Sequence, residues 1–211
     1  MNKKAILEQI ESNVRNCKKC RLCKEAKNAV PGEGDANAKI VFIGEAPGAT
    51  EDATGRPFVG RAGKLLEALL KALKMKREDV WIGNIIKHRP PKNRDPLPDE
   101  IKICEPYLTL QLRTINPDLV ITLGRFAMNY FYPDGKISRD HGRLIKSQGY
   151  NVYPIYHPAA GLRNGKMMEA LKLDFARIPK VLENIKKDDN LERSNGGPEF
   201  TASDGQLGLD L

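Results

Sequence analysis

The residues best suited to chemistry begin in a short turn of sequence Gly-Glu-Ala-Pro-Gly at residues 44–48. The apolar stretch 40–44 leads into this turn and predicts a buried parallel strand. The carboxyl end of such a strand is where open α/β sheets bind their ligands. The turn presents bare backbone N–H groups and the carboxylate of Glu45, and the ring of Phe58 follows after a Gly-Arg-Pro turn. Together they could hold a small planar molecule. The alternative is a loop that merely joins a strand to a helix.

Two further polar side chains come at the ends of predicted strands. Asn84 lies in the apolar stretch 80–86 and can both donate and accept hydrogen bonds, so it could read the edge of an amide-like ring. His157 follows the stretch 152–156, where an imidazole could donate a hydrogen bond to a developing negative charge. Each residue also has a plainer interpretation, because Asn84 could cap the following loop and His157 could be structural.

Three of the four cysteines stand three residues apart, as Cys17, Cys20 and Cys23, and the fourth is the distant Cys104. Two intervening residues let successive thiolates converge on one metal centre. Close cysteines with a remote fourth are typical of a ferredoxin-type [4Fe–4S] cluster. Zinc is the alternative, although its structural sites usually pair two close ligands with two more. Inert buried cysteines are the third interpretation, and a cytosolic protein is not expected to use disulfides.

The charge of the chain predicts a polyanionic partner. The formal net charge is +8, although residues 187–211 contain only two basic residues against six acidic ones. The basic body therefore favours nucleic acid as a partner. The loop of residues 87–96 is rich in both cations and prolines. Its stiffened backbone could bring Lys and Arg to phosphates at little cost in entropy, and the alternative is a solvated charged loop.

Strands and helices alternate along the chain. Apolar stretches predict four strands, at residues 40–44, 80–86, 118–124 and 152–156. Helical spacing or position predicts five helices, at residues 2–15, 62–75, 98–115, 125–132 and 166–186. This order predicts an α/β fold: a three-layer α/β/α sandwich around a short, four-stranded parallel sheet.

Length and composition favour one domain, residues 1–186, with a disordered acidic tail over residues 187–211. No apolar run approaches the length of a membrane span, and the N-terminus does not have the pattern of a signal peptide. We therefore expect a cytoplasmic protein with no membrane partner, and a monomer.

In this order and at these spacings, the motifs resemble family 4 of the uracil-DNA glycosylases, the iron–sulfur branch of that superfamily, over roughly residues 15–186. The motifs that carry the resemblance are Cys17-x-x-Cys20, residues 44–48 followed by Glu51-Asp52, Gly-Arg-Pro-Phe-Val-Gly at 55–60, Asn84, Arg-Pro-Pro-x-Asn-Arg at 89–94, Cys104, and His157-Pro158 with Leu162-Arg163. The resemblance implies a monofunctional enzyme that flips uracil out of single- or double-stranded DNA and hydrolyses its N-glycosidic bond, which initiates base-excision repair. No lysine stands in these motifs as a Schiff-base nucleophile, so lyase activity is not expected.

The resemblance also implies roles for individual residues. His157 would hydrogen-bond uracil O2 and stabilise the leaving anion, and Glu45 would position or activate water. Asn84 would pair with the uracil edge, Phe58 would stack on the ring, and Glu51 would help to exclude the methyl group of thymine. The backbone of Gly44, Ala46 and Gly48 would complete the uracil site. DNA contacts would come from Leu162 and Arg163 in the minor groove and from Arg89, Lys92 and Arg94.

One departure from the family pattern concerns the cluster ligands. The family usually has Lys-Cys-Arg-Pro-Pro where this chain has His88 within Lys-His-Arg-Pro-Pro. The expected [4Fe–4S] ligands are therefore Cys17, Cys20, Cys104 and His88, with Cys23 as the alternative to His88. A histidine here also resembles the DNA-crosslinking branch, but that branch carries its reactive His in a basic insertion that we do not find in this chain. Hydrolysis is thus preferred.

Two rival functions and one partner stay open at the level of sequence. The same scaffold could act on other deaminated bases or crosslink to its product, or the chain could be a non-catalytic iron–sulfur protein that binds DNA or transfers electrons. The last residues, Gln206–Leu211, resemble the QxxLx[LF] peptides with which bacterial repair proteins bind the sliding clamp. We expect the sliding clamp as a partner of this end.

Overall fold

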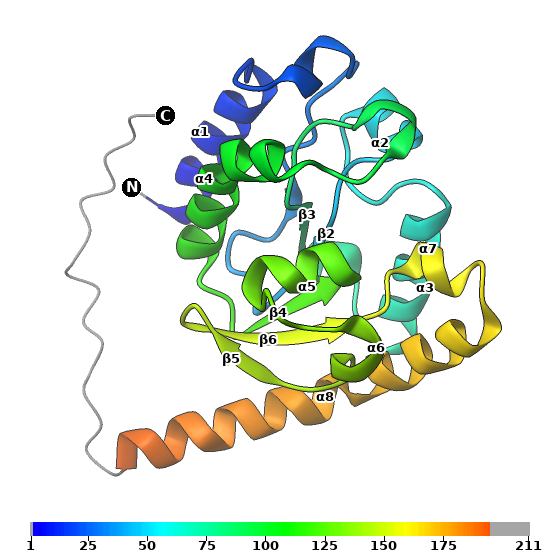
Figure 1. Ribbon diagram of the computed structural model, residues 1–211. Helices are drawn as coiled ribbons and strands as arrows, with labels where there is room; N and C mark the ends of the chain where they lie inside the picture. The colour runs from blue at the N-terminus through cyan, green and yellow to red at the C-terminus, as the bar shows by residue number, and fades with distance from the viewer. Residues whose placement is uncertain (1, 195–211) are drawn as a thin grey trace.

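The computed structural model describes residues 2–194, and the side chains of residues 2–188. Its centre is a six-stranded mixed sheet in the order β1-β3-β2-β4-β6-β5 (Figure 1). The strands are β1 (Glu33–Gly34), β2 (Ile40–Gly44), β3 (Trp81–Asn84), β4 (Leu119–Leu123), β5 (Ile145–Ser147) and β6 (Tyr150–Ile155).

The four central strands are parallel, and they are the four that the sequence predicts. The prediction of a four-stranded sheet is nevertheless too narrow, because β1 and β5 add an antiparallel edge on either side. Both edge strands are too short and too exposed to leave an apolar pattern in the sequence. β5 joins the sheet as one arm of a hairpin with β6, across the two residues 148–149.

The helices flank both faces of the sheet. They are α1 (Lys3–Arg15), α2 (Ala49–Thr54), α3 (Arg61–Ala72), α4 (Pro98–Ile115), α5 (Arg125–Phe131), α6 (Ile137–Asp140), α7 (Pro158–Gly161) and α8 (Gly165–Ser194), with single 3-10 turns η1 (Arg21–Lys24), η2 (Arg77–Asp79) and η3 (Pro91–Asn93). Helix α8 runs past the predicted end at residue 186, so the predicted tail begins inside it, and residues 195–211 lie outside the described residues.

The core divides into layers because successive side chains of a strand point to opposite faces. Ile40 and Phe42 of β2 face the cluster that α3 and α8 cover, whereas Val41 and Ile43 face the cluster under α4 and α5. A third, smaller cluster joins α1 to α4 through Ile10, Val14, Ala29 and Tyr107. Figure 1 shows α1 beside α4, and α8 lying along the opposite end of the molecule.

Among residues 2–194, no helix combines the length and apolar character that a membrane span requires.

Burial in the layer under α3 should dominate the stability of the fold. Leu66 of α3 is fully buried, whereas Leu173 of α8 is 60% exposed. Leu66→Ala should lower the free energy of unfolding by about 2–5 kcal/mol, because it removes buried contacts and leaves a cavity. Leu173→Ala should change it by less than about 0.5 kcal/mol. Urea denaturation measures both, and equal losses in the two variants would contradict this assignment of the core.

Candidate active site

The carboxyl ends of the four parallel strands open into one cavity of about 460 Å³. Each strand contributes to its lining: Glu45 follows β2, Asn84 ends β3, Gly124 follows β4, and Tyr156 with His157 follows β6. This is the position at which α/β sheets bind ligands. The cavity therefore lies where the sequence predicts a site.

The cavity brings together most of the residues that the sequence singles out. Its lining includes the predicted residues Glu45, Ala46, Gly48, Glu51, Phe58, Asn84, Arg94, His157 and Arg163. Gly44 lies just behind it. A Cβ at Gly44 would be 2.5 Å from Asn84 Oδ1 and 2.6 Å from Phe58 Cζ, so the glycine lets both side chains approach the strand end.

Three predicted DNA-binding residues lie outside the lining. Arg89 donates through Nε to Asn93 Oδ1 at 2.7 Å, and Lys92 is exposed. Leu162, at the end of α7, is 40% exposed. Among the predicted cations in the lining, Arg94 is tied to the buried Glu100 by two hydrogen bonds of 2.8 and 2.6 Å. Arg94 therefore stabilises its own loop as well as lining the cavity.

Asn84 is buried at the end of β3 and carries an unused acceptor. Its Oδ1 has no hydrogen-bond partner among the described residues. Its backbone carbonyl accepts from Nζ of the buried Lys87 at 2.9 Å, and the same Nζ donates to Gln111 Oε1 at 2.8 Å. Burial lowers the pKa of Lys87 to about 8. Because an unpaired buried acceptor is costly, Oδ1 is suited to a donor supplied by a ligand.

His157 is arranged as a neutral hydrogen-bond donor. Its Nδ1 accepts from the backbone N–H of Ala159 at 3.0 Å, which leaves the proton of a neutral ring on Nε2. Burial, and then the charge of Arg163, lower the pKa of His157 to about 4, although Glu51 acts in the opposite direction. The imidazole is therefore uncharged at pH 7, and its Nε2–H is the group available for a ligand.

The surroundings of Glu45 raise its pKa, whereas those of His157 lower the pKa of the imidazole. Burial and the negative charge of Asp95 raise its pKa to about 7, and Arg125 partly offsets them. Asp95 and Arg125 form an ion pair of 2.5 Å between the 87–97 loop and α5. Neither residue of this pair is among those predicted from the sequence. Arg125 had a recognisable signal, since it directly follows a predicted strand, whereas nothing local distinguishes Asp95.

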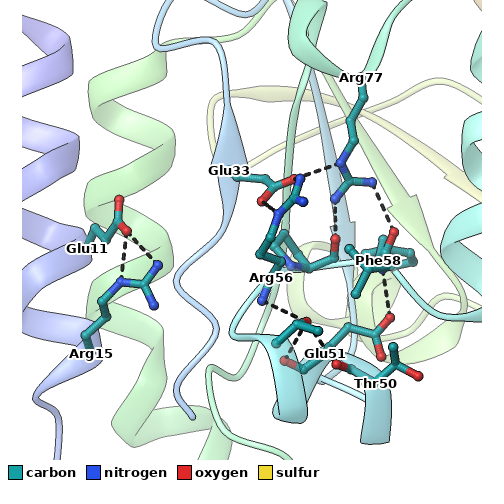
Figure 2. Close-up of polar contacts among 11 residues, drawn as sticks. Glu11, Arg15, Glu33, Thr50, Glu51, Arg56, Phe58 and Arg77 are labelled. Atoms are coloured by element: carbon teal, nitrogen blue, oxygen red, sulfur yellow. Dashed lines mark hydrogen bonds and ion pairs between the residues drawn. The ribbon is translucent and has the colours of Figure 1, made fainter.

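The segment that carries Phe58 is fixed by Glu51. Oε1 of Glu51 accepts from the backbone N–H of Val59 at 2.9 Å and of Gly60 at 2.8 Å. Figure 2 shows the Glu51 carboxylate beside the segment that carries Phe58. The ring of Phe58 lies 5.8 Å from that of His157, centroid to centroid. Glu51 thus anchors the segment, a role not predicted from the sequence, and its predicted effect on thymine stays a prediction.

The cysteines gather on another side of the fold, near the end of α1. A second cavity of about 290 Å³ is lined by Cys17, Cys23 and His88, among others, and the buried Nδ1 of His88 has no hydrogen-bond partner in the described part of the chain. Cys20 packs against the apolar cluster that contains Cys104. Burial raises the pKa of Cys104 to about 11 and also raises the pKa of Cys20.

Among the described side chains, those of residues 2–188, no three from His, Cys, Asp or Glu are gathered tightly enough to bind a single metal ion. The donor set nevertheless fits an iron–sulfur cluster: three closely spaced thiols, a fourth buried nearby, and an orphaned imidazole nitrogen beside them. Both candidates for the remaining ligand, His88 and Cys23, border the same cavity.

Comparison with known proteins shows to which family the chain belongs. The family model described as the uracil DNA glycosylase superfamily matches residues 31–180. The chain is 45% identical over 188 residues to the type-4 uracil-DNA glycosylase of Saccharolobus solfataricus, covering 84% of this chain and 87% of that one. It is 42% identical over 187 residues to the type-4 enzyme of Thermotoga maritima, covering 87% and 96%. A type-5 uracil-DNA glycosylase of Pyrobaculum aerophilum is 32% identical over 148 residues, which is 62% of this chain and 65% of that enzyme.

The chain therefore belongs to the uracil-DNA glycosylase superfamily, within its type-4 group. It is a uracil-DNA glycosylase that acts in base-excision repair.

The Asp95–Arg125 pair should set the pH dependence of the reaction. The sequence predicts that Glu45 positions or activates water, a role that requires its ionised form, so activity should fall as the pH falls through about 7. Asp95→Asn removes a neighbouring negative charge and should lower the pKa of Glu45, which moves the acid limb of the kcat/KM profile to lower pH. Arg125→Met removes a positive charge and should move that limb to higher pH. Shifts in the same direction for both variants would contradict the arrangement.

Proposed function

We propose that the cavity at the strand ends holds an extruded uracil and that the chain hydrolyses its bond to deoxyribose without a covalent enzyme intermediate. One observation carries the proposal: the unpaired Oδ1 of Asn84, the free Nε2–H of His157, the ring of Phe58 and the carboxylate of Glu45 all border one cavity. These are an acceptor, a donor, a stacking surface and a base. A pocket that receives a flipped base needs such groups.

Asn84 would select the base. Uracil presents an N3–H donor that matches the free Oδ1 of Asn84, whereas N3 of cytosine is an acceptor and would leave that buried oxygen unpaired. A site built around one hydrogen bond rejects the analogue that lacks it more strongly than an apolar pocket could. The ring of Phe58 would stack on the base, and backbone groups of the 44–48 turn would complete its surroundings.

His157 would stabilise the leaving group. Breaking the glycosidic bond places negative charge on uracil, and the Nε2–H of a neutral His157 would donate to O2 as this charge develops. A preorganised donor in a site that excludes water acts without reorganisation at the moment of reaction. The backbone N–H of Ala159 supports this role because it holds Nδ1 and thereby fixes the tautomer.

Glu45 would serve the sugar side of the reaction. Its carboxylate would position or activate the attacking water, and its charge would favour the oxocarbenium character of deoxyribose. A pKa of about 7 keeps a substantial fraction ionised at neutral pH while leaving the carboxylate basic enough to take a proton. No lysine of the described part of the chain lines this cavity, which supports a glycosylase without lyase activity.

DNA would approach across the loops around the cavity mouth. The exposed Leu162 would enter the gap left by the flipped base, with Arg163 beside it. Arg89, Lys92 and Arg94 would face phosphates.

Removing the imidazole of His157 should abolish most of the rate. We expect His157→Ala to lower the single-turnover rate of uracil release by about 10²–10³-fold, because one oxyanion-type donor is lost. The measurement uses a labelled uracil-containing oligonucleotide and alkali to cleave abasic sites. Lys180→Ala is the control, since the exposed Lys180 pairs with Glu183 on α8 outside the cavity lining and should change the rate little.

Two results would contradict the proposed chemistry. A denaturation-resistant protein–DNA band with the intact protein would move it to crosslinking, and preferential release of hypoxanthine or xanthine would move it to another base.

For the cofactor, we propose a [4Fe–4S] cluster held by Cys17, Cys20, Cys104 and His88, with Cys23 as the alternative to His88. The cluster would supply a structural crosslink between the N-terminal segment and the loop after β3, because hydrolysis requires no redox step. The orphaned Nδ1 of His88, on the cavity shared with Cys17, supports the histidine.

Two single variants should identify the fourth ligand. His88→Ala should lower the iron content and the visible absorption of the purified protein, because a ligand is lost, whereas Cys23→Ala should leave both unchanged. Cys104→Ala is the positive control for loss of a ligand. The reverse pattern, with iron lost only in Cys23→Ala, would assign the fourth position to the thiolate.

The clamp-binding end at Gln206–Leu211 lies outside the described residues and stays a prediction, as do the monomeric state and the cytoplasmic location.

A further inference from the structure

The backbone at Phe58 is held in an uncommon conformation. Its φ is +50°, in the left-handed region that non-glycine residues seldom adopt. The strain must be offset by contacts from the surroundings, and residues in such conformations often lie at ligand sites. The ring that this backbone carries is buried and lines the active-site cavity.

Arg77 binds the carbonyl side of this segment. From the 3-10 turn η2, its guanidinium donates to the backbone oxygen of Phe58 at 3.0 Å and also to that of Pro57 (Figure 2). Glu33, on the edge strand β1, accepts from Nε of the same guanidinium at 2.8 Å and so fixes its plane. The Arg77 side chain is only 16% exposed, so water competes little for these charge-assisted bonds.

The opposite side of the segment is held by Glu51, through the N–H groups of residues 59 and 60. Charged side chains thus fix four consecutive residues, 57–60, with carbonyls bound on one side of Phe58 and N–H groups on the other. Helix α3 packs closely against this segment, since a Cβ at Gly63 of α3 would clash with the Phe58 carbonyl.

We propose that Arg77, oriented by Glu33, is a positioning residue that fixes the Phe58 ring for stacking on the extruded base. This inference rests on the stacking role of Phe58 in the proposed function. Arg77 is absent from the cavity lining, so it acts through the backbone of Phe58 rather than on the substrate. Ring orientation matters because a displacement of about 1 Å in a positioned group can cost about 10²-fold in rate.

Arg56 provides a matched control within the same network. It binds the same carboxylate, Glu33, with two bonds of 2.9 Å, but it makes no hydrogen bond to the carbonyls of Pro57 or Phe58. Its side chain is 60% exposed, and exposed ion pairs contribute little. A variant of Arg56 therefore removes a charge and an ion pair without releasing the segment.

The experiment is a double-mutant cycle on kcat/KM for uracil release and on the inhibition constant of free uracil. Arg77→Met keeps much of the side-chain length but removes the donors, and it should lower kcat/KM about tenfold and weaken inhibition by uracil. Arg77→Lys retains one donor and should recover part of the loss. In the Phe58→Ala background, Arg77→Met should change kcat/KM by less than about twofold, because the ring it positions is gone. Thermal unfolding and near-ultraviolet circular dichroism verify that each variant is folded.

The outcomes distinguish a failure of the Arg77 role from a failure of the Phe58 role. If Arg77→Met costs the same in the wild-type and Phe58→Ala backgrounds, or if Arg56→Met costs as much as Arg77→Met, Arg77 does not act through Phe58 and the inference is overturned while the proposed function stands. If Phe58→Ala itself leaves the rate and uracil inhibition unchanged, the stacking role fails and the inference fails with it.

Discussion

The parallel pairing of β3, β2, β4 and β6 is the constraint on which the site depends. Parallel strands all end at the same edge of a sheet, so the residues that follow them are brought together whatever their separation in sequence. Glu45 and His157 are more than a hundred residues apart and line the same cavity for this reason. Hydrophobic burial on both faces holds the sheet, and the loops can then carry polar groups without weakening it.

The site places two ionisable groups in surroundings that move their pKa values in opposite senses. Burial disfavours the charged form of each group, so it lowers the pKa of His157 and raises that of Glu45. Local charges then shift these pKa values further. Arg163 lowers the pKa of His157, whereas in the Asp95–Arg125 pair Asp95 raises the pKa of Glu45 and Arg125 lowers it. One cavity thereby holds both a neutral donor and a basic carboxylate, because burial disfavours the charged form of each group.

Much of this site was accessible from the sequence, because its signals are local. Buried parallel strands are continuous apolar runs, and Asn84 and His157 stand directly at their ends. The edge strands β1 and β5 gave no such signal, since pairing with a neighbour, rather than burial, makes them strands. The Asp95–Arg125 pair and the Arg77–Glu33 contact join residues that are distant in the chain, and charged residues in loops look alike until the fold brings them together. Glu51 was recognised as a site residue, but its hydrogen bonds to residues 59 and 60 depend on a backbone conformation that no local pattern predicts.

The tautomer of His157 has a consequence for the product. A neutral imidazole that accepts at Nδ1 has no acidic proton to give near pH 7, because its remaining N–H ionises only in strong base. On the proposed mechanism, the base therefore departs as uracilate rather than as uracil. The proton that completes the free base then comes from a donor other than His157, after the glycosidic bond has broken.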